Sequence, residues 1–166
     1  MHEEVIMAGF GGQGVMSMGQ LLAYAGMLEN KEVSWLPSYG PEMRGGTANC
    51  SVIVSDDSVA SPVVTDATAA IIMNRPSLGK FEGAVMPKGS IFINTSLVDE
   101  KCSRDDVDTY YIPANEIADE LGNSRIANMI MLGAYIKKTG IVSPESVIES
   151  LKEVLGSSKA HLIPVN

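Results

Sequence analysis

The stretch that decides the fold is Gly9-Phe10-Gly11-Gly12-Gln13-Gly14. It follows a short apolar run, residues 5–8, and precedes a long apolar segment, residues 15–28. This order predicts a strand, a tight turn and a helix, the first β-α unit of a Rossmann-like domain. Glycine suits the turn because the backbone must take positive φ values and let another group approach closely. The free N–H groups and positive dipole at the helix start suit an anion such as phosphate or carboxylate.

The glycine spacing also suggests a dinucleotide-binding site, because Gly9, Gly11 and Gly14 satisfy G-x-G-x-x-G. Such a site needs an acidic residue at the end of the second strand to bind the ribose. The second apolar run, residues 33–36, leads instead into Pro37-Ser38-Tyr39-Gly40, which contains no carboxylate. The sequence therefore favours a turn that binds another anion or packs against a neighbouring subunit over an NAD or FAD site. A third interpretation is that the glycines only let the helix pack tightly on the strand.

The composition is typical of a globular protein, with 45% hydrophobic and 19% charged residues. At 166 residues the chain is long enough for one domain with a sizeable core, so we expect a single domain spanning 1–166. A net charge of −8 with scattered Lys and Arg argues against nucleic acid. No apolar run approaches the roughly 20 residues that span a bilayer, and the N-terminus lacks a basic segment. We therefore expect no membrane partner and a cytoplasmic location.

Metal-binding and catalytic motifs are missing from the sequence. Cys50 and Cys102 stand far apart, and His2 and His161 lie near the two ends. An iron–sulfur cluster wants four thiolates, so this chain alone is not expected to hold a cluster or a structural zinc ion. The nucleophile, zinc-protease and Walker motifs are also missing, and no catalytic residue is predicted.

A second unusual segment, residues 38–46, is a loop by its Gly-Pro and Gly-Gly signals. It nevertheless carries Tyr39, Glu42 and Arg44. One interpretation is a binding loop at the carboxyl ends of the strands, in the same crevice as the glycine turn. The alternative is that Glu42 and Arg44 are solvated and Tyr39 packs locally.

The remaining pattern predicts a three-layer α/β domain with a mixed, mostly parallel sheet and C-terminal helices. The segment 47–55 alternates like a strand and follows a loop too short for a helical crossover, so it is expected to be antiparallel. The sequence predicts further strands at 69–73, 89–94 and 108–113 and helices at 77–82, 116–121, 126–136 and 144–155. Asn115 is expected to cap the helix 116–121, and Gly122-Asn123 to stop it. Ser143-Pro144-Glu145 is expected to start the last helix, and Gly156 to end it. A turn is expected at 87–89.

Two predicted helices, 15–28 and 126–136, are apolar on nearly every side, and the second is interrupted only by Asn128. The first carries small residues at Gly19, Ala23 and Gly26 on one face. A helix apolar all round is buried on more than one side. The sequence favours the hypothesis that a neighbouring subunit covers these two helices, and its ten methionines fit that hypothesis. The alternative is that these residues simply fill the core.

Three motifs resemble the gamma subunit of 2-oxoacid:ferredoxin oxidoreductases. They are Gly-Phe-Gly-Gly-Gln-Gly-Val at 9–15, Ser-Tyr-Gly-Pro-Glu-Met-Arg-Gly-Gly at 38–46, and the pair Pro-Ala-Asn-Glu-Ile-Ala-Asp-Glu-Leu-Gly-Asn at 113–123 with Asn-Met-Ile-Met-Leu-Gly at 128–133. The resemblance covers nearly the whole chain in the expected order. It is strongest to gamma subunits of the 2-oxoglutarate and branched-chain 2-oxoacid enzymes, and pyruvate synthase gamma subunits are similar.

The resemblance implies an oxidative decarboxylation in which a 2-oxoacid and coenzyme A give acyl-CoA and carbon dioxide and electrons pass to ferredoxin. Thiamine diphosphate, magnesium and iron–sulfur clusters do the difficult chemistry, bound mainly by alpha, beta and delta-type subunits. This chain would complete the assembly and help shape the coenzyme A cleft.

The resemblance also suggests roles for individual residues. The turn glycines Gly9, Gly11, Gly12 and Gly14 would offer N–H groups to an anion such as a coenzyme A phosphate, with Gln13 adding a side-chain amide. Arg44 would supply positive charge, which Tyr39 and Glu42 would orient. Contact with a neighbouring subunit is the competing role for all these residues. A rival from another class is a stand-alone nucleotide-binding or regulatory module.

Overall fold

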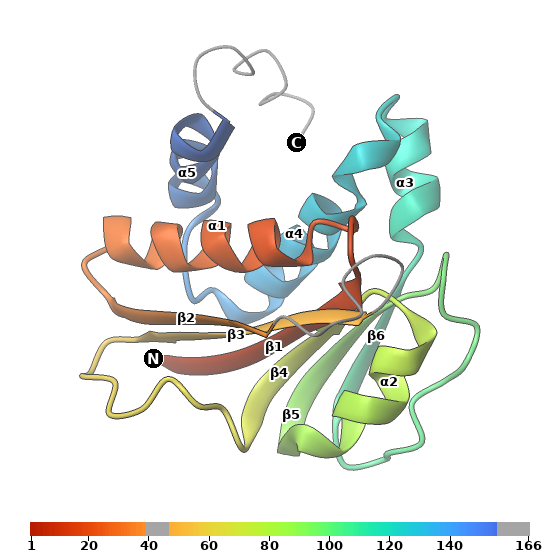
Figure 1. Ribbon diagram of the computed structural model, residues 1–166, viewed down its shortest axis with the longest axis horizontal. Coiled ribbons are helices and arrows are strands. Elements are labelled where there is room, and N and C mark those ends of the chain that lie inside the picture. Colours follow the sequence, from red (N-terminus) through yellow and green to blue (C-terminus); the bar gives the residue numbers. More distant parts are fainter. Residues whose placement is uncertain (39–46, 156–166) are drawn as a thin grey trace.

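The computed structural model describes residues 1–38 and 47–155, which form one six-stranded sheet with helices on both faces (Figure 1). The order across the sheet is β2-β3-β1-β4-β5-β6. β3 is antiparallel to β1 and β2, whereas the pairs β1-β4, β4-β5 and β5-β6 are parallel. The prediction of a mixed, mostly parallel sheet is therefore confirmed. The strands are β1 (His2–Phe10), β2 (Glu32–Ser38), β3 (Thr47–Ser55), β4 (Ala67–Ile72), β5 (Val85–Asn94) and β6 (Asp108–Ile112).

The helices form two unequal layers. The larger layer, on one face of the sheet, contains α1, α3, α4 and α5, and the opposite face is covered by α2 (Figure 1). The helices are α1 (Val15–Leu28), α2 (Arg75–Phe81), α3 (Ala114–Glu120), α4 (Ala127–Thr139) and α5 (Pro144–Leu155), with short 3-10 helices η1 (Glu82–Ala84) and η2 (Ser124–Ile126). In the described residues no helix is long and apolar enough to cross a membrane.

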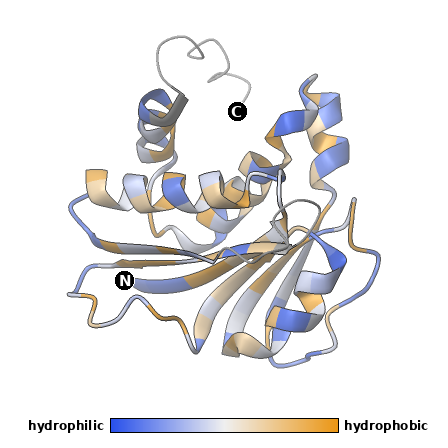
Figure 2. Cartoon of the chain, viewed as in Figure 1, coloured by the Kyte–Doolittle hydropathy of each residue, from blue (hydrophilic) through white to orange (hydrophobic). Residues whose placement is uncertain are grey.

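The core is split by the sheet into two clusters, because successive strand side chains point to opposite faces. In β1, Val5 and Met7 join the cluster under α1 and α4, whereas Ile6 joins the cluster under α2. Figure 2 shows that the central strands carry long hydrophobic stretches. Those strands are buried on both sides, which explains why their sequence reads as continuous apolar runs.

The apolar surface of α1 is mostly covered by its own chain. A Cβ at Gly19 would lie 2.6 Å from Cys50 Sγ, and one at Gly26 would lie 2.7 Å from Val33 Cγ1. The small-residue face is therefore where the sheet approaches the helix, not where a neighbouring subunit packs. Met18 and Met131 are fully buried in the same core. The expectation that a subunit covers the small-residue face is therefore wrong for α1, whereas α4 is only partly covered by its own chain.

Two local predictions are also wrong. Asn115 does not cap α3, whose N-cap is Pro113. The Asn115 side chain instead accepts a hydrogen bond from Asn94 Nδ2 (2.8 Å), because α3 starts directly against the end of β5. The segment 87–89 is not a separate turn but part of β5, where Lys88 has φ 70° and the pairing with β4 shifts. The proline and glycine there accommodate a bulge in the strand.

The other predicted elements are all present, with several bounds that differ from the prediction by a few residues. The ranges of α1 and β3 match the predictions, and α3 ends at Glu120, shortly before Gly122 with its φ of 82°. Ser143 caps α5 through a hydrogen bond from Ser146 N to its Oγ (3.2 Å). The predicted end at Gly156 lies outside the described residues.

Adding a methyl group at Gly19 tests the close contact between α1 and the sheet. We expect Gly19→Ala to lower the free energy of unfolding by about 1–3 kcal/mol, because the new Cβ overlaps buried atoms of Cys50 and Trp35. The measurement is urea unfolding followed by circular dichroism.

The matched control is Gly133→Ala in α4, where a Cβ meets nothing within 4 Å. Because alanine favours helix over glycine, this variant should gain up to about 1 kcal/mol. Equal stabilisation by both changes would contradict the tight packing of α1.

Candidate functional site

The sheet has a topological switch point between β1 and β4. The chain leaves β1 into α1 on one face and leaves β4 into α2 on the other (Figure 1). The two strands are parallel neighbours, and Met73 N continues the ladder by donating to Ala8 O (2.8 Å). Open α/β sheets bind ligands in the crevice outside the carboxyl ends of the strands at such a point.

The glycine turn lies at this switch point, as the sequence predicts. Gly12 and Gly14 have φ values of 92° and 77°, in a region that L side chains rarely adopt. Gly14 is the N-cap of α1 and, having no side chain, leaves the first N–H groups of the helix without a side-chain cap. Gly9 lies at the end of β1, where a Cβ would lie 2.8 Å from Met73 Cβ. Gly11 completes the turn.

Gln13 holds the turn in place with both ends of its side chain. Its Oε1 accepts a hydrogen bond from Phe10 N (2.6 Å), and its Nε2 donates to Met73 O (3.0 Å). The side chain therefore ties the turn after β1 to the residue after β4. The amide that the sequence suggested for an anion contributes one of its hydrogens to this internal bond.

Asn128, the single polar interruption of the α4 pattern, has a structural role here. Its Nδ2 donates to Gly14 O (3.2 Å), and its Oδ1 accepts from Met129 N (2.9 Å). A Cβ on Gly14 would collide with the Asn128 amide. The start of α4 is thereby fixed against the start of α1.

A hollow of about 380 Å³ opens beside the turn. Its lining consists of Gly12, Gln13, Gly14, Met73, Asn115, Ser124, Arg125 and Ala127. Arg125 is exposed, and among the ion pairs of the described residues none involves it. The backbone N–H of Arg125 donates a hydrogen bond to Asn123 Oδ1 (3.0 Å), which caps the start of η2. Arg125 and the N-terminus of α1 thus line one hollow, a combination that favours an anion.

Sequence reasoning missed Arg125 as a site residue. It stands more than 100 positions from the glycine turn, in a stretch that looks only like a helix start. The one available signal was a cation two residues after the Gly122-Asn123 stop. Tyr39, Glu42 and Arg44, the other candidates from the sequence, lie outside the described residues.

The strand order is unlike that of a dinucleotide site. There, the second strand lies beside the first and its acidic end reaches the ribose. Here antiparallel β3 separates β1 from β2, and β2 is an outer strand of the sheet. Glu29 precedes β2 and Glu32 is its first residue, and the Glu29 carboxylate accepts a hydrogen bond from Ser143 N (2.7 Å). Neither carboxylate lies at the carboxyl end of β2.

The two cysteines are separated by the sheet. Cys50 is fully buried in the cluster under α1, and its burial raises the pKa of the thiol to about 12. Cys102 packs against the cluster on the opposite face. They cannot share a metal or a cluster, and Cys50 stays protonated at neutral pH.

A comparison with protein families identifies the family of the chain. Residues 4–166 match the family model described as pyruvate ferredoxin/flavodoxin oxidoreductase. The chain belongs to this family.

One relative of this chain is the ketoisovalerate oxidoreductase subunit VorA of Methanothermobacter marburgensis. It is 40% identical over 164 residues, which cover 98% of this chain and 34% of VorA. The chain therefore spans about a third of the length of this relative.

Two solved structures share the fold. The gamma subunit of a keto/oxoacid ferredoxin oxidoreductase from Geobacter sulfurreducens has a TM-score of 0.82 and 26% identity, covering 97% of this chain and 91% of that one. The 2-oxoglutarate:ferredoxin oxidoreductase from Magnetococcus marinus, with 2-oxoglutarate, coenzyme A and succinyl-CoA bound, has a TM-score of 0.88 and 22% identity. The match covers 99% of this chain and 29% of that one.

Replacing Gln13 tests its role in holding the turn. Gln13→Glu keeps an acceptor for Phe10 N but replaces the donor to Met73 O by a negatively charged oxygen. We expect a loss of about 1–3 kcal/mol in the free energy of unfolding, measured by urea titration.

The control is Gln20→Glu on the exposed side of α1, which should change stability by less than about 0.5 kcal/mol. If both variants are equally stable, the Gln13 bonds do not hold the turn.

Proposed function

We propose that this chain is the gamma subunit of a 2-oxoacid:ferredoxin oxidoreductase in the cytoplasm. The enzyme oxidatively decarboxylates a 2-oxoacid with coenzyme A and passes electrons to ferredoxin. The observation that carries the proposal is the family match over residues 4–166, supported by the likeness to a gamma subunit of nearly the same length. In this proposal the chain forms a single domain and works with alpha, beta and delta-type subunits.

The crevice at the glycine turn is proposed to bind a phosphate group of coenzyme A. Its volume of about 380 Å³ suits one end of that molecule, which would extend beyond the hollow. The α1 N-terminus and the Arg125 guanidinium supply positive potential on a chain of net charge −8. Gln13 acts by holding the turn, and Arg44, with Tyr39 and Glu42, is proposed to add to the same site from the 38–46 loop. Bound coenzyme A in the Magnetococcus marinus enzyme supports this proposal.

The redox cofactors implied by the family do not fit this chain. Iron–sulfur clusters need several thiolates together, and the two cysteines lie on opposite faces of the sheet. We therefore place thiamine diphosphate, magnesium and the clusters on the other subunits. The reaction chemistry belongs to those subunits, and this chain contributes binding and shape.

The rival function is a stand-alone nucleotide-binding module. It predicts a chain that binds a nucleotide without partners. Outer-strand β2, with no carboxylate at its described end, counts against a dinucleotide version of that module.

Purification of the tagged chain from its own cells tests the proposed function. We expect the other oxidoreductase subunits to copurify, with dye reduction that depends on coenzyme A and on one 2-oxoacid. Recovery of the chain alone, with nucleotide binding and no activity, would favour the rival.

Within that complex, Arg125→Gln tests the crevice. Loss of one charge-assisted contact of about 1.5–3 kcal/mol should raise the KM for coenzyme A about tenfold or more, with little change in the KM for the oxoacid. The control is Arg75→Gln, since Arg75 lies on α2 and pairs with Glu100.

An unchanged KM for coenzyme A in Arg125→Gln would remove this residue from the site. The Arg44→Ala variant distinguishes the two roles of the loop. A raised KM for coenzyme A supports binding, and loss of the other subunits supports an interface.

A further inference from the structure

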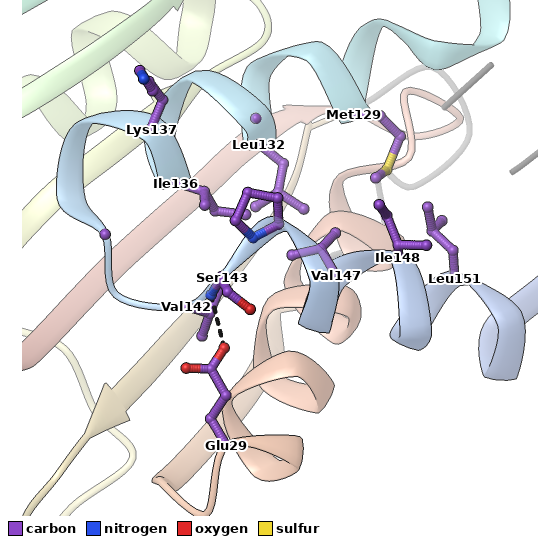
Figure 3. A pocket seen from close by; sticks show the side chains of 13 residues that line it. Glu29, Met129, Leu132, Ile136, Lys137, Val142, Ser143, Val147, Ile148 and Leu151 are labelled. Atoms are coloured by element: carbon purple, nitrogen blue, oxygen red, sulfur yellow. Dashed lines mark hydrogen bonds between the residues drawn. The ribbon is translucent and has the colours of Figure 1, made fainter. Parts of the chain in front are cut away.

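A second hollow of the molecule lies away from the crevice, between α4 and α5. It is an open groove of about 890 Å³ (Figure 3). The apolar residues that define it are Met129, Leu132, Ile136, Val147, Ile148 and Leu151. Ile148 is 45% exposed although its neighbours Val147 and Leu151 are buried. The apolar core under α4 and α5 thus extends to the surface at this groove, which shares no lining residue with the crevice at the glycine turn.

The groove is held open by local structure. Gly140 has φ 63° and ends α4, and Ser143 caps α5 a few residues later. The Glu29 carboxylate accepts a hydrogen bond from Ser143 N at 2.7 Å, which Figure 3 shows at one end of the groove. Burial raises the pKa of Glu29, but bonds from Ser143 and Ser146 outweigh it, so the pKa is lowered and the carboxylate stays charged. The angle between the two helices is therefore fixed before any partner binds.

Gly133 keeps the floor of the groove clear. It is exposed in the middle of α4, lines the groove, and a Cβ there would meet nothing within 4 Å. Glycine in the middle of a helix costs about 1 kcal/mol relative to alanine. Among residues 1–38 and 47–155 nothing packs against this position to offset that cost, unlike at Gly19. An external surface that approaches α4 closely would account for the glycine.

A cationic ridge borders the groove on its other side. Lys137 lines this groove and also a third hollow, of about 680 Å³, beside the outer strand β6. That hollow has an aromatic lining from Phe92, Tyr110 and Tyr111, and Lys138 Nζ lies 5.7 Å from the centre of the Tyr110 ring. In Figure 3 the Lys137 side chain points away from the apolar residues of the groove. Two apolar hollows thus flank two adjacent positive charges.

These features describe one surface with a distinct chemistry. On a chain with 20 acidic and 12 basic residues, adjacent lysines between apolar hollows favour a partner that brings carboxylates. The groove between two helices favours a helix with an apolar stripe, because such a helix buries its stripe against facing side chains.

We propose that the α4–α5 groove and the Lys137-Lys138 ridge bind a helix of the oxidoreductase subunit that packs against this chain. The helix carries an apolar stripe with carboxylates beside it. This inference rests on the proposed function. The VorA relative supports it, because about two thirds of that protein lies outside the matched region and gives this domain further polypeptide to pack against.

Filling the groove tests the proposal. Gly133→Gln adds a side chain at the groove, where a Cβ meets no atom of the described residues within 4 Å. The matched control is Gly79→Gln in α2, on the opposite face, where a Cβ also meets nothing within 4 Å. Each tagged variant is produced in the native cells, and the copurified oxidoreductase subunits are quantified by mass spectrometry. We expect Gly133→Gln to lower their recovery at least tenfold and Gly79→Gln to leave it within twofold.

Charge reversal tests the ridge separately. Lys137→Glu should lower subunit recovery severalfold and make it more sensitive to salt. Lys80→Glu, an exposed lysine at the end of α2, is its control and should match the wild type. Thermal unfolding of all four variants should occur within a few degrees of the wild type, which separates lost binding from lost folding.

The outcomes distinguish this inference from the proposed function. If the wild-type chain recovers no oxidoreductase subunit, the proposed function fails and the inference with it. If the wild type and Gly133→Gln recover the subunits equally, the proposed function stands and the inference is overturned. Light scattering of the purified chain adds a third result: a wild-type dimer that Gly133→Gln converts to monomer assigns the groove to a second copy and overturns the proposal.

Discussion

The Gln13 side chain joins the two strands on which the crevice depends. Its bonds to Phe10 N and Met73 O connect the turn after β1 with the residue after β4, across the point where the chain changes faces. Asn128 adds a third connection, from α4 to the first turn of α1. Glycine at positions 9 and 14 is required by these contacts, since a Cβ would meet Met73 or the Asn128 amide. The turn is therefore a rigid feature that presents the start of α1 to the crevice.

The antiparallel strand β3 changes what a glycine-rich turn can bind. By pairing with β1 and β2 at the same time, it moves β2 to an outer position of the sheet. The carboxyl end of β2 is then one strand farther from the glycine turn than in a dinucleotide-binding sheet. The α1 N-terminus remains available to an anion, but the ribose partner of a dinucleotide has no place beside it. Arg125, brought in from η2, provides charge at the crevice instead.

The crevice and the groove divide the larger helical layer between two roles. α4 takes part in both, because its start contacts the glycine turn through Asn128 and its later turns line the groove. With the proposed partner on one half and the proposed ligand site on the other, α4 would link assembly to the shape of that site. Its buried residues, including Met131, Leu132 and Tyr135, pack in the core between these two regions.

The sequence by itself determined the elements whose signals are local. The glycine turn, the bounds of α1 and β3, and the Ser143 cap follow from neighbouring residues, because turn geometry, periodicity and capping act over a few positions. The resemblance to the gamma subunits added the family. Only the tertiary structure decided that Gly19 and Gly26 face the sheet, that Asn115 bonds to Asn94 and that Arg125 joins the crevice. These contacts join residues far apart in the chain, and helical periodicity shows that a face is buried without showing what covers it.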